Sequence, residues 1–166
     1  MNYYNLNIQK AEITDVSALQ EMGIAMALET EGISLNPTVL QLGVEYVIHH
    51  PHAGFYLIAR NGTERAGSLM VTPEWSDWRN TWIWWIQSVY VYPQFRKMGV
   101  YRQLHATVLE MAKQERIPIL RLYVIQENTK AQTTYQSCGM QASAYQLWEQ
   151  EVNLNSEQPD GLPSVP

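Results

Sequence analysis

The sequence predicts a mixed α/β fold, an α+β arrangement in which a mixed β-sheet is flanked by helices. Three observations lead to this fold class. Two helical patterns follow a short first strand, a tight-turn hairpin precedes a long apolar strand over residues 81–91, and helices and strands alternate after it. The predicted element order is therefore β, α, α, β, β, β, α, β, α, β.

The first part of the chain contains a short strand over residues 5–11 and two amphipathic helices. Thr14 or Asp15 is a suitable N-cap for the first helix, whose apolar positions recur every three or four residues: Val16, Leu19, Met22 and Met26. Asn36-Pro37 begins the second helix, which ends before Pro51. Its apolar side consists of Leu40, Val44, Val47 and Ile48.

A hairpin is predicted next, from residues 54–60 and 66–72. Asn61-Gly62 lies between them and supplies the positive φ angles that a tight turn requires. Residues 73–80 then connect to the strand over 81–91, in which both sets of alternate positions are largely apolar. Such a strand is covered on both faces, so we expect it in the middle of the sheet.

The second part of the chain is predicted to contain two helices and two strands. A helix over 100–115 has a buried stripe made of Val100, Leu104, Val108 and Met111. A strand over 119–125, a helix over 129–137 that ends at Gly139, and a strand over 144–152 follow. We expect one domain over residues 1–152 and a mobile or surface-draped tail over 153–166, which contains three prolines.

Composition excludes several classes of protein. A formal net charge of −5 argues against a general binder of nucleic acid or of anionic membranes. No apolar run reaches the roughly 18–20 residues that span a bilayer, and the first ten residues do not resemble a secretory signal. Cys138 is the only cysteine, so no internal disulfide forms. We expect a soluble, cytoplasmic protein.

Histidine and cysteine positions do not indicate a metal site or a nucleophile. His49, His50 and His52 lie together at a predicted helix end, but no matching cluster of ligands occurs elsewhere, so we expect no metal. His105 is expected on a helix surface. Cys138 has no sequence context typical of a nucleophile and is interpreted as a structural thiol.

The stretch over residues 92–104 has one glycine, Gly99, among three cations, Arg96, Lys97 and Arg102. A helix N-terminus exposes backbone N–H groups and the positive end of the helix dipole, and a glycine lets an anion approach them. The pattern therefore fits a phosphate-binding loop. By itself the pattern favours an ordinary strand-to-helix turn with solvated cations, because short glycine motifs are frequent by chance.

Residues 81–140 resemble the core of the GNAT superfamily of N-acetyltransferases. The family's loop pattern is Arg or Gln, two residues, Gly, one residue, and then Gly or Ala. Arg96 and Gly99 match it, whereas Tyr101 stands at the last position. A second, separate motif is similar to the family's later helix: Asn128, Ala131 and Tyr135, followed by Gly139-Met140. The element order extends the resemblance to most of residues 5–151.

The resemblance implies a GNAT-like fold with splayed parallel strands in the middle, and acetyl-CoA as co-substrate without a metal. The backbone of Val89, Tyr90 and Val91 would pair with the pantetheine arm, and a backbone N–H at Val89 would polarise the thioester. The loop would bind the pyrophosphate through Arg96, Lys97, Met98, Gly99, Val100, Tyr101 and Arg102. Tyr101 is expected to crowd the pyrophosphate.

Two residues of the second motif have implied roles and structural alternatives. Asn128 would reach the pantetheine or adenosine portion, and it is also a suitable helix N-cap. Tyr135 would stand near the cofactor sulfur as the catalytic proton donor, and it is also a suitable core aromatic.

The resemblance further implies acetyl transfer from the thioester to a primary amine of a small molecule or a peptide. Gln87 stands where some family members have a basic glutamate, and it cannot accept a proton. Substrate-side candidates are therefore Gln87 with four carboxylates elsewhere: Glu29, Glu31, Glu74 and Asp77. The resemblance also allows a homodimer. Two alternatives remain, namely a non-catalytic CoA-binding regulatory module and an α/β interaction domain whose Arg96 loop binds no cofactor.

Five tryptophans lie before and within the aromatic strand: Trp75, Trp78, Trp82, Trp84 and Trp85. They are suited to walling a substrate pocket or to binding a cation through their ring faces. Core packing or a dimer contact is the more common use of such residues.

Overall fold

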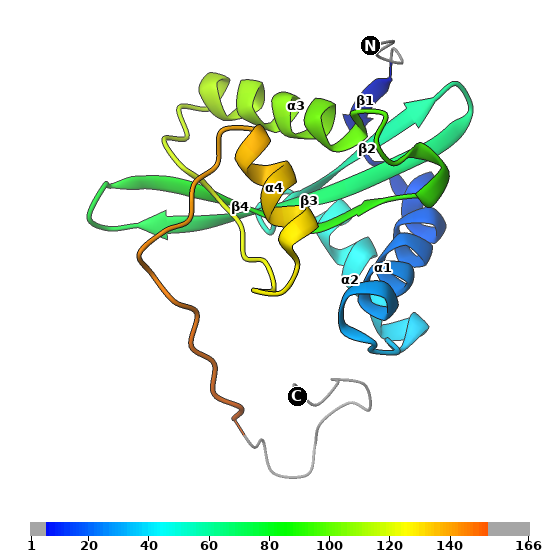
Figure 1. Ribbon diagram of the computed structural model, residues 1–166, viewed down its shortest axis with the longest axis horizontal. Helices are drawn as coiled ribbons and strands as arrows, with labels where there is room; N and C mark the ends of the chain where they lie inside the picture. The colour runs from blue at the N-terminus through cyan, green and yellow to red at the C-terminus, as the bar shows by residue number, and fades with distance from the viewer. Residues whose placement is uncertain (1–5, 153–166) are drawn as a thin grey trace. The chain divides into compact units, whose positions relative to one another are not determined.

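A computed structural model of the chain describes residues 6–152 (Figure 1). The chain divides into two compact units, Met1–Leu122 (the first unit) and Tyr123–Pro166 (the second unit), and each is described by itself. The single domain expected over 1–152 remains a prediction, and the tail expected over 153–166 lies outside the described residues. Among the helices described, none is both long and apolar enough to cross a bilayer.

The first unit contains the mixed sheet that the sequence predicts. Its strand order is β1-β2-β3-β4-β5, antiparallel from β1 to β4 and parallel between β4 and β5. The long apolar strand is β4, and it lies inside the sheet as expected. The strand bounds are β1 Asn7–Lys10, β2 Phe55–Asn61, β3 Glu64–Ser76, β4 Thr81–Val91 and β5 Leu120–Arg121.

Strand β3 continues through Pro73 to Ser76, where the sequence predicts a connection. Pro73 lies opposite Trp84 of β4, whose N–H donates to the carbonyl of Ile119 at 3.1 Å. The Trp84 amide therefore points toward β5, and the pair with Pro73 is one that exchanges no backbone hydrogen bonds. A proline at such a position removes no bond from the ladder, so the strand is not interrupted.

Helices cover both faces of the sheet in the first unit (Figure 1). Helices α1 (Val16–Glu31) and α2 (Pro37–His49) lie on one face, and α3 (Val100–Gln114) lies on the other. Short 3-10 turns, Ile13–Asp15 and Pro93–Phe95, precede α1 and α3. The helix bounds agree with the predicted ranges. The predicted stripe of α3 is buried in the core at Val100, Leu104 and Val108.

His105 of α3 is buried, so its expected position on a helix surface is wrong. Its ring lies 5.8 Å from that of Tyr101, one helical turn earlier. Burial lowers the pKa of the imidazole, because desolvation disfavours the charged form. The buried stripe of α3 is thus wider than its aliphatic residues indicate.

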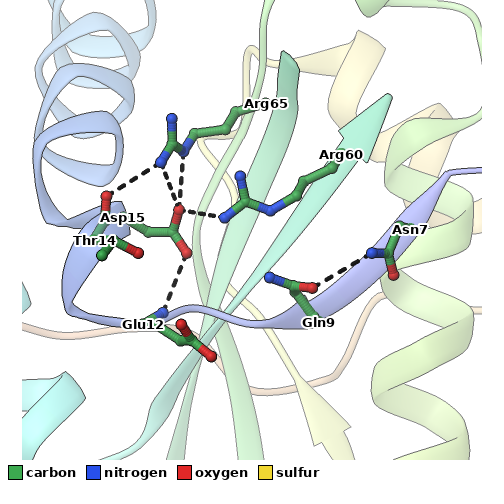
Figure 2. A network of polar contacts seen from close by, with 7 residues as sticks. All are labelled: Asn7, Gln9, Glu12, Thr14, Asp15, Arg60 and Arg65. Carbon is green, nitrogen blue, oxygen red and sulfur yellow. Dashed lines mark hydrogen bonds and ion pairs between the residues drawn. The ribbon is translucent and has the colours of Figure 1, made fainter. Parts of the chain in front are cut away.

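Asp15 stands at the N-cap position of α1, but its carboxylate caps nothing within that helix. Instead it is fully buried and accepts from Arg60 at 2.5 Å, from Arg65 at 2.9 Å and from the backbone N–H of Glu12 at 3.2 Å. Figure 2 shows both guanidinium groups converging on this carboxylate from strands β2 and β3. The network ties the start of α1 to the β2–β3 hairpin.

Burial alone would raise the pKa of Asp15. The Glu12 N–H, Arg65 and Arg60 outweigh that effect and hold the pKa below its usual range. The carboxylate is therefore ionised at neutral pH, although it is shielded from solvent.

The second unit contains α4 (Thr129–Ser137), with the predicted bounds. Gly139 follows it with φ +89°, and the Met140 N–H donates to the carbonyl of Tyr135, as expected for a glycine at the helix C-terminus. The strand predicted over 144–152 is wrong, because no strand occurs among residues 123–152. The strand predicted over 119–125 is reduced to the two residues of β5.

Candidate active site

A β-bulge interrupts β4 at Ser88 and Val89. Met70 of β3 lies opposite Gln87, and Ser68 lies opposite Tyr90, so Leu69 alone faces two residues of β4. Ser88 has φ +49°, in the left-handed region. On the neighbouring strand, a Cβ on Gly67 would stand 2.6 Å from the carbonyl oxygen of Tyr90. The bulge therefore bends β4 at a place where β3 must have a glycine.

Beyond the bulge, β4 extends past its pairing with β5. The described ladder between these parallel strands contains the pairs Trp84 with Leu120 and Trp85 with Arg121, whereas β4 runs on to Val91. Backbone groups on an unpaired strand edge are available to a ligand. Val89, Tyr90 and Val91, the predicted partners of a pantetheine arm, all belong to this part of β4.

Two residues of the loop between β4 and α3 have a left-handed backbone conformation. Lys97 and Gly99 have φ angles of +64° and +81°. Gly99 is the N-cap of α3 and supplies no capping side chain, while its carbonyl accepts from the Gln103 N–H at 3.0 Å. N–H groups of a first helical turn have no acceptor within the helix. Val100 is buried in the core and fixes the helix start in place.

The cations of this loop are held differently from one another. Arg96 donates through Nε to the carbonyl of Val91 at 2.9 Å and through a terminal nitrogen to the Glu29 carboxylate at 2.7 Å. Lys97 and Arg102 are exposed, and Met98 is half-buried. Arg96 therefore anchors the loop to the end of β4 and to α1, which the sequence pattern does not indicate.

Glu29, a predicted substrate residue, lies at the end of α1 beside β4. It accepts from the Tyr90 hydroxyl at 3.0 Å as well as from Arg96, whose guanidinium lies 5.5 Å from the Tyr90 ring centre. The hydrogen bond from Arg96 is the main cause that lowers the pKa of Glu29, against a smaller opposing effect of burial. A carboxylate with a lowered pKa is a weak general base.

Tyr101 is buried at the start of α3, with 8% of its surface exposed. A bulky residue is thus accommodated at the position where the family pattern has Gly or Ala. Its expected crowding of a bound pyrophosphate remains a prediction.

Three further substrate candidates lie on the β3–β4 hairpin. The Glu74 carboxylate accepts from Trp85 Nε1 and, at 3.3 Å, from Arg121 of β5. Gln87 donates to Thr72 Oγ1 at 2.5 Å. Asp77 lies in the turn and accepts from the backbone N–H of Trp78 at 2.8 Å. Glu74 and Gln87 share one sheet face, whereas Asp77 lies at the hairpin tip.

Glu31, the fourth carboxylate, is exposed at the last residue of α1. It stands two residues after Glu29, and none of the described residues forms a hydrogen bond with its side chain. The structure therefore places Glu29 in one group, with Tyr90 and Arg96. It places Glu74 in a second group, with Trp85 and Arg121. Glu31 and Asp77 belong to neither group.

The second unit holds the two remaining predicted site residues. Asn128 is the N-cap of α4, and its side chain accepts from the Ala131 N–H at 3.1 Å, so its structural alternative is confirmed. Tyr135 lies at the end of the second turn of α4, and burial raises the pKa of its hydroxyl. A phenol of raised pKa is protonated at neutral pH, so its O–H is present to donate, although the raised pKa makes it a weaker acid.

Comparison with known proteins identifies the family. The sequence model described as "Acetyltransferase (GNAT) family" matches residues 24–140. The chain belongs to the GNAT acetyltransferase family. A structure described as a possible acetyltransferase from Clostridium difficile 630 has 34% identity and a TM-score of 0.83, covering 89% of this chain and 97% of that one. The curated proteins give no match.

More distant structures share the GNAT fold. A predicted acetyltransferase from Clostridium acetobutylicum, solved with acetyl-CoA, has 18% identity and a TM-score of 0.73, with 87% of this chain and 96% of that chain covered. AAC(6')-Iy in complex with a bisubstrate analogue of CoA and acetylneamine has 16% identity and a TM-score of 0.72, with 89% and 99% covered. At these identities the likeness concerns the fold alone.

Sequence patterns did not reveal two features of the candidate site. The left-handed conformation of Ser88 has no sequence signal, because serine is not a residue that this conformation selects. The link from Glu29 to Arg96 joins residues far apart in the sequence. Only the polar pair Gln87-Ser88, within an otherwise apolar strand, marks the place of the bulge.

Most of the five tryptophans were expected to pack in the core, and three of them do not. Trp84 is buried, but Trp75, Trp78 and Trp82 are largely exposed, with the rings of Trp75 and Trp82 5.2 Å apart. Core packing is therefore wrong for these three. In the part of the chain that the structure describes, no group of three or more His, Cys, Asp or Glu side chains is arranged to hold a metal.

Proposed function

We propose that this GNAT protein is an acetyl-CoA-dependent N-acetyltransferase that transfers the acetyl group directly to a primary amine of a small molecule or peptide. Acetyl-CoA is the co-substrate, and no metal takes part. Both structures named above for their bound CoA compounds support this choice of co-substrate.

The observation that carries the proposal is the combination of a bulged, unpaired β4 edge with a glycine-capped helix start. The backbone of Val89 and Val91 suits the amides of a pantetheine arm, and Gly99 begins α3 without a capping side chain, so this helix N-terminus suits a pyrophosphate. These two features follow one another in the chain within the first unit. An edge suited to amides and a loop suited to phosphates together match the two polar parts of CoA.

The proposed reaction forms one bond and breaks one. The amine nitrogen attacks the thioester carbonyl carbon, the amide C–N bond forms, and the C–S bond breaks. The amine loses a proton and the departing thiolate gains one. We propose Tyr135 as the group that protonates the thiolate, since burial keeps its hydroxyl in the protonated form.

The amine proton requires an acceptor. An alkyl amine with a pKa near about 10.4 is well under ~1% free base at neutral pH. Glu29 has a lowered pKa, Glu74 binds Arg121, and Gln87 cannot take a proton. We therefore propose that water carries this proton to solvent, and that Glu29 and Glu74 shape the surroundings of the amine.

Two measurements test this function. Calorimetry with acetyl-CoA should show binding, and Gly99→Val should weaken it while Gly62→Val, at the equally left-handed hairpin turn, should not. Release of free CoA across a panel of amines should then identify an acceptor, with mass spectrometry locating the acetyl group on nitrogen. Absence of binding at millimolar acetyl-CoA would overturn the proposal.

The non-catalytic CoA-binding module remains the second candidate, because the structure commits both Glu29 and Glu74 to arginine partners. Under this alternative acetyl-CoA binds and no amine in the panel releases CoA. The two candidates thus differ in turnover and agree in binding.

A further inference from the structure

The side chain of Arg96 is held by two hydrogen bonds within the first unit. Its Nε donates to the Val91 carbonyl at 2.9 Å, and a terminal nitrogen donates to the Glu29 carboxylate at 2.7 Å. The second oxygen of Glu29 accepts from the Tyr90 hydroxyl at 3.0 Å. Glu29 thus joins α1 both to the end of β4 and to the loop that follows it.

The side chain of Tyr90 gives this contact a fixed base. Tyr90 is 6% exposed and packs in the core with Met22 of α1 and Ile58 of β2. Its ring also meets that of Tyr92 edge to face, with 5.5 Å between the ring centres. The Arg96 guanidinium lies 5.5 Å from the Tyr90 ring centre. Arg96 is therefore held beside a side chain whose own position the core sets.

The backbone turns sharply immediately after Arg96. Lys97 has φ +64°, in the left-handed region that is unfavourable for a residue with a side chain. Such a conformation persists only where the surrounding structure enforces it. The contacts of Arg96 hold the chain one residue before this turn, and the burial of Val100 holds it on the helix side. Between these two points Gly99 begins α3.

We propose that Glu29 is a positioning residue for CoA binding, which acts through Arg96 to hold the loop between β4 and α3 in the conformation that receives the pyrophosphate. This inference rests on the function proposed above. Glu29 compensates the charge of Arg96, so the pair adds no net charge to the loop, and the exposed Lys97 supplies attraction for the phosphates. Arg96 then serves mainly as a hydrogen-bond donor that fixes the backbone.

Charge and positioning predict opposite effects of removing Glu29. Loss of a carboxylate near a bound anion should tighten CoA binding, because like charges repel. Loss of the acceptor for Arg96 should weaken CoA binding, because ordering the loop then costs binding free energy. The side chains of Arg96 and Glu29 are 43% and 42% exposed, so we expect a net weakening of about 3-fold to 5-fold.

Calorimetry with CoA on matched variants measures this effect. Glu29→Ala should raise the Kd by about 3-fold to 5-fold, and Glu29→Gln, which keeps an acceptor oxygen, should fall between Glu29→Ala and the wild type. Glu110→Ala is the control, because it removes a carboxylate that is likewise paired with a cation, Lys113, and changes the net charge equally. Its Kd for CoA should equal that of the wild type.

A second pair of variants tests whether Glu29 acts through Arg96. In the Arg96→Ala background Glu29 has no arginine to hold, and only its charge affects the phosphates. Adding Glu29→Ala to Arg96→Ala should therefore tighten CoA binding, whereas the same change in the wild type weakens it. A residue that only supports the fold would not show this reversal of sign.

The outcomes separate this inference from the proposed function. Absence of CoA binding to the wild type would overturn the proposed function, and this inference with it. CoA binding that Glu29→Ala leaves unchanged or tightens overturns this inference alone. The same holds if Glu29→Ala weakens binding equally with and without Arg96, or if Glu110→Ala weakens it as much, because Glu29 would then act through general stability or net charge.

Discussion

Replacing Asp15 by alanine should destabilise the protein by about 2–4 kcal/mol, since it removes the common acceptor of two arginines and a backbone N–H. Removal of one partner from a fully buried ion pair costs about 3–5 kcal/mol. Here Asp15 is 0% exposed, but Arg60 and Arg65 retain 19% and 33% side-chain exposure. Water can therefore reach both guanidinium groups in the variant, which lowers the expected cost below the upper end of that range.

Urea unfolding followed by circular dichroism measures this free energy. Asp15→Asn keeps the shape and one oxygen acceptor but loses the charge, so it should fall between the wild type and Asp15→Ala. Glu110→Gln is the matched control, because its pair with Lys113 is exposed and contributes at most about 0.5 kcal/mol. A loss below about 1 kcal/mol for Asp15→Ala would refute the reasoning, because Arg60, Arg65 and the Glu12 N–H would all have lost their shared acceptor at little cost in stability.

The pH dependence supplies a second readout for Asp15. Its pKa is lowered in the folded protein relative to about 3.9 in the unfolded chain. The stability that this difference contributes is present above the unfolded value and is lost as the pH falls through the folded pKa. The stability gap between wild type and Asp15→Asn should therefore narrow as the pH falls below about 4. A gap that stays constant down to pH 2 would contradict the assignment.

Four substitutions test the proposed site. Tyr135→Phe should lower turnover about 100-fold in steady-state kinetics and leave acetyl-CoA affinity unchanged, because only the proton donor is lost. Gly99→Val should weaken acetyl-CoA binding about tenfold or more in calorimetry, since a φ of +81° costs a β-branched residue about 1–2 kcal/mol or more and distorts the loop. Glu29→Gln should change turnover less than about tenfold at pH 8, and a 100-fold loss would make Glu29 the base. Tyr101→Gly should tighten acetyl-CoA binding if its ring crowds the pyrophosphate, and a thermal scan should show a lower Tm because the ring is buried.

Local sequence patterns determined most elements of this GNAT protein. Asn36-Pro37 set the start of α2, Gly62, with φ +63°, set the hairpin turn, and Gly139 set the end of α4, because each signal acts through the backbone of a few neighbouring residues. The tight-turn pattern predicts a positive φ angle at Asn61 as well, but Asn61 ends β2 opposite Glu64, so the turn consists of Gly62 and Thr63. The same local signals marked the glycine loop before α3. Motif spacing, read as a family resemblance, indicated the GNAT fold.

Tertiary structure alone decided which side chains meet and which strand finds a partner. The pairing of Glu29 with Arg96, and of Asp15 with Arg60 and Arg65, joins residues that only the fold brings together. The bulge at Ser88 depends on the register between β3 and β4, which no single strand specifies. Residues 144–152 have a high strand propensity, which is a local property of the sequence. A strand also requires backbone hydrogen bonds to a neighbouring strand, and the sequence of the segment does not specify one.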